Sequence, residues 1–243
     1  MWHFQRIEPE HIPFEFTLQT HYLSFVGAGG KTTLIEYLAA EAVRRGKRVA
    51  ITTTTKIWAK MPYVLWPDLG KGQARPDFIR VGKALVNGKL TALEAREVAE
   101  LGSAYDLVLI EADGSKGKPL KYPAEYEPVI PSFSDRVMVL AGLDALSGRA
   151  DEQIFRWELF ERATGVSGDA PVTPALFLRF LEDDALMKLV DREKCVIVLN
   201  KYDACVEKHA VTDLAKAALK KTGVARIVLS SLFLETFYGL QRL

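Results

Sequence analysis

The chain alternates between short apolar runs and longer stretches whose apolar residues recur at helical spacing. The apolar runs are typical of buried strands and occupy residues 21–26, 48–53, 78–81, 106–111, 136–140, 194–199 and 225–229. Helical spacing predicts a helix that ends at Gly46, helices over 91–101, 151–163 and 207–221, and one or two helices over 173–190. Strands that alternate with helices predict an α/β fold with three layers, a mainly parallel central sheet and helices on both faces.

The pattern is regular enough to predict a single domain over residues 1–243. Residues 1–20 show no clear period and are interpreted as an N-terminal extension. Prolines interrupt residues 56–100, which we interpret as an insertion in the domain and not as a second domain. The strand at 225–229 is expected to be the last one.

Composition and charge exclude several classes of protein. The formal net charge is +1, so no basic field favours nucleic acid. No apolar run reaches 18 residues, and the first residues lack an apolar stretch of signal-peptide length, so neither a membrane span nor export is expected. The two cysteines, Cys195 and Cys205, show no metal-ligand spacing, which favours a reducing compartment, the cytoplasm.

A glycine-rich turn follows the strand at 21–26 and reads Gly27-Ala28-Gly29-Gly30-Lys31-Thr32-Thr33. Glycines at such a turn let backbone N–H groups surround an anion, and the start of the next helix adds partial positive charge. We expect Lys31 to reach the β- and γ-phosphates of a nucleotide and Thr32 to bind Mg²⁺. Phe25 stands where the full motif has its first glycine, so this is a shortened form. The motif predicts a P-loop NTPase; the alternative is a glycine turn that only tightens the chain.

Carboxylates and hydroxyls follow two of the predicted strands. Glu111 and Asp113 come at the end of the strand at 106–111, where ligands bind in open α/β sheets, and either is expected to hold Mg²⁺ or orient a water. Thr54 follows the strand at 48–53 and is a further candidate for Mg²⁺ or the γ-phosphate. Lys31, Glu111 and Asp113 are therefore the candidate catalytic residues. Plain capping and turn roles are the alternative for the carboxylates.

Two polar segments at the last predicted strands favour a nucleotide base. Asn200-Lys201-Tyr202-Asp203 follows the strand at 194–199, and Ser230-Ser231 follows the strand at 225–229. This layout is the one by which GTPases recognise guanine, whose two N–H donors an aspartate can accept. The alternative for Asn200, Lys201, Asp203 and Ser230 is an ordinary turn with a helix cap.

Several cations lie beyond Asp113, and they are candidates to hold an anionic substrate or transition-state charge. Solvated surface side chains are the alternative. They are Lys116, Lys118, Lys121, Arg149 and Arg156.

Several stretches together resemble one known family, YqeC. The resemblance rests on residues 25–33, 51–56, 111–115 with 118–121, 127–131, 142–146 and 198–201. It implies an accessory protein for selenium-dependent molybdenum hydroxylases, with the hydroxylase or its cofactor as the partner. The short phosphate loop also resembles that of Mur ligases, which use ATP, so both GTP and ATP stay open as the nucleotide.

The combined prediction is a Mg²⁺-dependent nucleoside-triphosphate-binding protein, an NTPase or an NTP-dependent transferase that drives a maturation step. Two alternatives stay open. One is a nucleotide-gated binding module or chaperone with little turnover, and the other is a small-molecule kinase.

Overall fold

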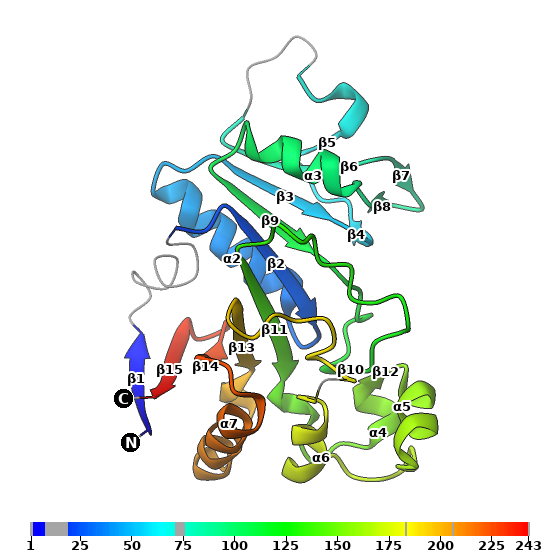
Figure 1. Cartoon of the computed structure of the whole chain (residues 1–243), viewed down its shortest axis with the longest axis vertical. Coiled ribbons are helices and arrows are strands. Elements are labelled where there is room, and N and C mark those ends of the chain that lie inside the picture. The colour runs from blue at the N-terminus through cyan, green and yellow to red at the C-terminus, as the bar shows by residue number, and fades with distance from the viewer. Residues whose placement is uncertain (1, 8–18, 71–75, 183, 206, 243) are drawn as a thin grey trace.

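A large twisted sheet forms the centre of the computed structural model, which describes residues 2–7, 19–70, 76–182, 184–205 and 207–242 (Figure 1). Ten strands of this described part join in the order β1-β15-β14-β13-β11-β2-β9-β3-β6-β5. Their bounds are β1 Trp2–Ile7, β2 Tyr22–Gly27, β3 Val49–Thr53, β5 Tyr63–Leu65, β6 Phe78–Gly82, β9 Leu107–Glu111, β11 Arg136–Gly142, β13 Cys195–Asn200, β14 Arg226–Ser231 and β15 Thr236–Arg242.

The sheet is parallel from β14 to β5, as the alternation of strands and helices predicts. Among these ten strands, β15 alone runs in the opposite direction, and it pairs antiparallel with β14 on one side and with β1 on the other. The expectation that the strand at 225–229 is the last one is wrong, because β15 follows it. The two chain segments that form β1 and β15 pair across nearly the whole sequence, and a local hydrophobic pattern carries no information on such a pairing.

Helices cover both faces of the sheet, which confirms the predicted three-layer α/β class. Helix α2 (Lys31–Arg44) packs Leu34, Ile35 and Leu38 on one face. Helices α3 (Ala95–Gly102), α5 (Trp157–Thr164), α6 (Pro174–Arg179) and α7 (Lys208–Thr222) contribute to the apolar clusters on the other face. The alternating burial of β9 explains this division, since Leu107 and Leu109 face α2 while Val108 and Ile110 face α3.

Three of the predicted helices are shorter than expected, and the one expected at 91–101 begins only at Ala95. The helix expected at 151–163 is divided into α4 (Ala150–Gln153), the short strand β12 (Ile154–Phe155) and α5. The break occurs because β12 pairs with β10 (Leu120–Lys121) and Arg156 has a left-handed backbone, with φ 63°. In the region 173–190, α6 ends at Arg179, and turns follow it.

The remaining elements are short. Strands β4 (Lys56–Trp58), β7 (Leu85–Val86) and β8 (Lys89–Thr91) form a separate antiparallel sheet, whereas β5 and β6 extend the central one. Turns of 3₁₀ helix are η2 (Trp66–Asp68), η3 (Leu143–Ala145) and η4 (Tyr202–Ala204).

In the part of the chain that the structure describes, no helix combines the length and apolar character needed to cross a membrane.

Candidate functional site

The phosphate loop connects β2 to α2 at the carboxyl edge of the sheet, and its glycines are required by close backbone contacts. Gly27, Gly29 and Gly30 have φ of 92°, 80° and 122°. A Cβ at Gly27 would lie 2.2 Å from the Leu140 carbonyl oxygen, and one at Gly30 would lie 2.4 Å from Nδ2 of Asn200. A larger residue at either position would push the loop away from β11 or β13.

The backbone of the loop is held on one side and leaves the start of α2 open. The Ala28 N–H donates to the Leu140 carbonyl at 2.9 Å, and the Gly29 N–H donates to the Lys118 carbonyl at 3.1 Å. Helix α2 begins directly after Gly30, and no side chain caps its N terminus. The first N–H groups of an uncapped helix attract an anion, so the loop has the polarity that a phosphate requires.

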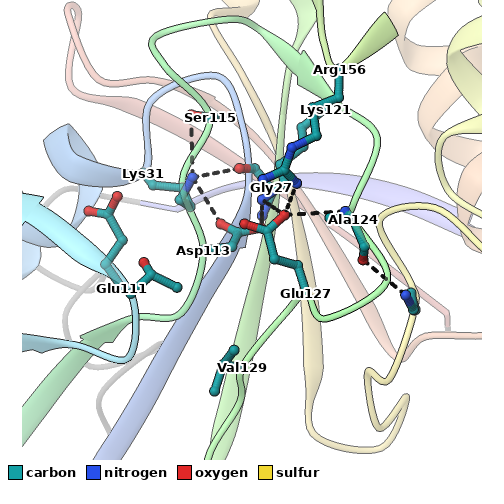
Figure 2. Close-up of polar contacts among 12 residues, drawn as sticks. Gly27, Lys31, Glu111, Asp113, Ser115, Lys121, Ala124, Glu127, Val129 and Arg156 are labelled. Carbon is teal, nitrogen blue, oxygen red and sulfur yellow. Dashed lines mark hydrogen bonds and ion pairs between the residues drawn. The ribbon is translucent and has the colours of Figure 1, made fainter. Parts of the chain in front are cut away.

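Lys31 lies at this open end with its ammonium group turned back onto the loop (Figure 2). Its Nζ donates to the Gly27 carbonyl oxygen at 2.5 Å and forms an ion pair with Oδ1 of Asp113 at 3.1 Å. The Lys31 residue is only 3% exposed. The predicted phosphate-binding lysine and the predicted carboxylate are therefore direct neighbours.

The two predicted carboxylates, Glu111 and Asp113, have different surroundings. Oε2 of Glu111 accepts a hydrogen bond from the Thr32 hydroxyl at 3.1 Å. Burial raises the pKa of Glu111 above its ordinary value, while Lys31 and the Thr32 hydroxyl oppose that shift. Asp113 instead accepts the Gly27 N–H on Oδ2 at 2.9 Å and pairs with Lys31 on Oδ1. Glu111 is thus the carboxylate next to a hydroxyl, and Asp113 is the one that anchors the loop.

A line of alternating charges continues from Asp113 into the loop after β9. Nζ of Lys121 lies 3.0 Å from Oδ2 of Asp113 and 2.9 Å from Oε2 of Glu127, and Glu127 also pairs with Arg156. Burial alone would raise the pKa of Glu127, but the bonds from Arg156 and Lys121 hold it below its ordinary value. We call these five residues the buried ion chain: Lys31, Asp113, Lys121, Glu127 and Arg156.

The buried ion chain changes the interpretation of the cations predicted to hold an anion. Lys121 is completely buried between two carboxylates, and Arg156 is paired with Glu127. Sequence reasoning had no role for Glu127, because nothing in its local pattern indicates that a lysine six residues earlier is buried beside it. The other candidates have partners of their own. Lys116 lies over the Phe155 ring, Lys118 donates to the Glu152 carbonyl, and Arg149 pairs with Asp151.

Thr54 connects the end of β3 to the same loop. Its hydroxyl donates to the Val129 carbonyl oxygen at 2.6 Å, and its N–H donates to the Glu111 carbonyl at 3.3 Å. The neighbouring Thr53 hydroxyl donates to the same Glu111 carbonyl at 2.7 Å. The predicted metal-binding role of Thr54 stays a prediction, while its position next to Glu111 follows from the register of β3 and β9.

The residues predicted to bind a base divide into two groups. Nδ2 of Asn200 donates to the Gly29 carbonyl at 2.8 Å, and Oδ1 of Asn200 accepts from the Ser230 hydroxyl at 2.9 Å. Asn200 and Ser230 therefore support the phosphate loop. Lys201 pairs with Asp144 at 2.5 Å, and Asp203 is exposed in η4. Only Asn200 of the four donates directly to the phosphate loop.

The donor set suits Mg²⁺ shared with a ligand better than a metal held by protein alone. Among the described residues, no three His, Cys, Asp or Glu side chains gather closely enough to hold a metal ion. Mg²⁺ keeps several waters and takes one or two carboxylates together with substrate phosphates. Thr32 and Glu111, 3.1 Å apart beside the loop, have the hydroxyl and carboxylate oxygens for this arrangement.

Comparison with known proteins identifies the family. The family model described as YqeC protein matches residues 23–158, which include the phosphate loop and the whole buried ion chain. A relative from Escherichia coli (strain K12), named "Uncharacterized protein YqeC", is 36% identical in an alignment 169 residues long that covers 61% of this chain and 62% of the relative. The match thus spans less than two thirds of that relative's length. The crystal structure of hydrogenase maturation factor HypB from Archaeoglobus fulgidus aligns with a TM-score of 0.44 and 17% identity over 93% of this chain and 89% of that one. The chain belongs to the YqeC family.

Proposed function

We propose that this protein binds a nucleoside triphosphate with Mg²⁺ at the phosphate loop and hydrolyses it or transfers its γ-phosphate. One observation carries the proposal: a lysine, Lys31, begins a helix with no side-chain cap, directly after glycines that a close-packed loop requires. Backbone N–H groups, helix polarity and an ammonium group act together on phosphate oxygens in such a loop.

Each side chain takes a role that its contacts support. Lys31 and the first N–H groups of α2 bind the phosphates, and Thr32 with Glu111 holds Mg²⁺. Bound Mg²⁺ neutralises charge that develops on the transferred phosphoryl group. Asp113 positions Lys31 and the Gly27 N–H, since both of its oxygens are already engaged. Catalysis is then mainly a matter of positioning and charge stabilisation.

The base is proposed to lie beside Asn200, Lys201, Asp203 and Ser230, at the ends of β13 and β14. Asp203 is the exposed carboxylate of this group and is the one suited to accept both N–H donors of guanine. GTP and ATP are both nucleotides that this edge can accommodate, and Asp203 favours GTP.

We propose that this chemistry takes place in the cytoplasm and serves the maturation of a selenium-dependent molybdenum hydroxylase, the role that the family resemblance implies. The partner is the hydroxylase or its cofactor.

A nucleotide-gated binding module with little turnover is the second candidate, and a specific observation favours it. Both oxygens of Asp113 are held by lysines and a backbone N–H, so Glu111 alone is left to serve both the metal and a water.

Calorimetric titration with GTP and with ATP, each with and without Mg²⁺, tests the proposal. Lys31→Ala is expected to weaken binding roughly a hundredfold or more, because it removes the ammonium group from a buried phosphate site. Lys220→Ala is the matched control, since Lys220 is exposed on α7, and it is expected to bind as the unaltered protein does. The proposal fails if the unaltered protein binds neither nucleotide at millimolar concentration, or if Lys31→Ala binds equally well.

A further inference from the structure

The buried ion chain is an unusual use of charge for a protein interior. Lys121 is 0% exposed, Glu127 is 4% exposed and Asp113 is 3% exposed. Removing ions from water is costly, and replacing a buried ion pair by apolar groups is often neutral or even stabilising. Stability alone therefore gives no reason for Lys121 to be a lysine.

Asp113 is shared by two ammonium groups that bind different oxygens. Lys31 contacts Oδ1 at 3.1 Å, and Lys121 contacts Oδ2 at 3.0 Å. The same Oδ2 accepts the Gly27 N–H at the start of the phosphate loop. Figure 2 shows the two lysines approaching Asp113 from different segments of the chain. If one of the two lysines moves away, Asp113 still forms an ion pair with the other.

A phosphate ligand creates the need for such a partner. The Lys31 ammonium is engaged by Asp113 and by the Gly27 carbonyl. To bind phosphate it must turn away from Asp113, and a carboxylate left buried without a cation is strongly unfavourable. We propose that Lys121 is a positioning residue that keeps Asp113 paired, and so fixed on the Gly27 N–H, while Lys31 turns to the phosphates. This inference rests on the proposed function.

The surroundings of Lys121 hold it in place for this role. Its backbone belongs to β10, which pairs with β12, and the Tyr122 N–H donates to the Phe155 carbonyl at 3.0 Å. Its ammonium is held from the far side by Glu127, which Arg156 and the Ala124 N–H hold in turn. Lys121 is therefore anchored between two carboxylates, whereas Lys31 is the first residue of the uncapped helix α2.

A charge-neutral double variant tests the proposal. Lys121→Met with Glu127→Gln removes one cation and one anion, and each new side chain is similar in size to the one it replaces. The net charge near the phosphate loop is therefore unchanged. Asp113 then depends on Lys31 alone, and binding of the Mg²⁺ nucleotide by calorimetry should weaken at least about tenfold. Lys83→Met with Glu97→Gln is the matched control, because it removes an ion pair with a buried carboxylate at α3 and should leave affinity unchanged. Thermal unfolding of both variants reports any loss of stability.

The outcomes separate the two proposals. Weaker binding by a double variant that unfolds no earlier than the control supports the positioning role. Unchanged affinity in that variant overturns it and leaves the proposed function standing, whereas an unaltered protein that binds no nucleotide overturns the proposed function itself. If the double variant fails to fold, residue-level hydrogen exchange on the unaltered protein decides. The Gly27 amide should stay protected from exchange when nucleotide binds. Faster exchange there would show that the hydrogen bond from the Gly27 N–H to Asp113 has broken, and it would overturn the proposal.

Discussion

The two halves of the candidate site are built differently, although both lie at the carboxyl edge of one sheet. The phosphate half lies around β2 and β9, and the base half lies at the ends of β13 and β14. In the phosphate half, charged side chains pair with one another, and a hydroxyl donates to Glu111. In the base half, Asn200 and Ser230 support the loop through neutral hydrogen bonds, and Asp203 is exposed.

For the proposed function, this difference predicts that the phosphate half supplies affinity and that the base half supplies selectivity. Pre-formed polar contacts lower the cost of ordering a site when a ligand arrives, so the phosphate half is suited to give most of the binding free energy. An exposed carboxylate such as Asp203 contributes little to affinity by itself. Such a carboxylate discriminates between bases because guanine has the two N–H donors that it can accept, whereas adenine lacks this pair.

Gly30→Ala is expected to have the largest effect, because Gly30 lies where the two halves meet. The new Cβ would lie 2.4 Å from Nδ2 of Asn200, on a backbone with φ 122°. We expect a loss of stability of about 2–4 kcal/mol in urea unfolding and loss of nucleotide binding by calorimetry. Gly114→Ala is the control, since no heavy atom beyond its two chain neighbours lies within 4 Å of the added Cβ. Equal behaviour of the two variants would show that the halves are not joined at Gly30.

Asn200→Ala is expected to have the next largest effect. It removes the bonds to the Gly29 carbonyl and the Ser230 hydroxyl, both buried, and should cost about 1–3 kcal/mol of stability in denaturant unfolding. GTP and ATP should lose affinity by similar factors, because the loop and not the base is disturbed. Ser230→Ala, which leaves the Gly29 bond in place, should cost less. A selective loss of GTP in Asn200→Ala would instead assign Asn200 to the base.

Glu111→Gln should change the pH dependence of stability. Burial raises the pKa of Glu111 in the folded state, so between its unfolded and folded pKa values the folded protein binds more protons. Stability contributed by this group is therefore present at low pH and is lost as pH rises through that window. Glu111→Gln should be more stable than the unaltered protein at neutral pH, with the difference vanishing toward acid pH. Thermal unfolding in chelator across pH 4 to pH 8 is the measurement, and a destabilised variant at neutral pH would contradict the assignment.

Asp203→Ala should have the smallest effect on the fold and the most selective effect on binding. Because Asp203 is exposed, we expect stability to change by less than about 0.5 kcal/mol. GTP affinity should fall roughly tenfold while ATP affinity stays constant. Competition between the two nucleotides measures this ratio, and Asp213→Ala on α7 is an exposed control. Equal losses for both nucleotides would refute a base contact at Asp203.

The parallel part of the fold could be predicted because its signals are local. Each buried parallel strand is a continuous apolar run, and each is followed by a helical period or a turn. The division of the helix expected at 151–163 could not be predicted, since it depends on the pairing of β12 with β10, more than thirty residues earlier in the chain. Strand β15 was missed for the same reason: its pairing partners decide its conformation.

The candidate site could be predicted in position but not in its internal pairing. A glycine loop and carboxylates at the ends of strands are found from residue type and strand order, and the structure brings Lys31, Thr32, Glu111 and Asp113 together. Residue type and spacing do not distinguish the buried Lys121 from the exposed Lys116, which precedes it in the same loop. Only burial separates them: Lys121 is buried beside Glu127, which pairs in turn with Arg156 from a distant segment.

The pairing of β1 with β15 has a consequence for the order in which the molecule folds. Phe4 pairs with Leu240, so the two strands come from opposite ends of the described chain. During synthesis β1 leaves the ribosome long before its partner exists, and the parallel core from β2 to β14 can assemble in the meantime. Contacts that are so distant in sequence form slowly because the intervening chain must first be ordered. We therefore expect this edge of the sheet to close last, after the parallel core has assembled.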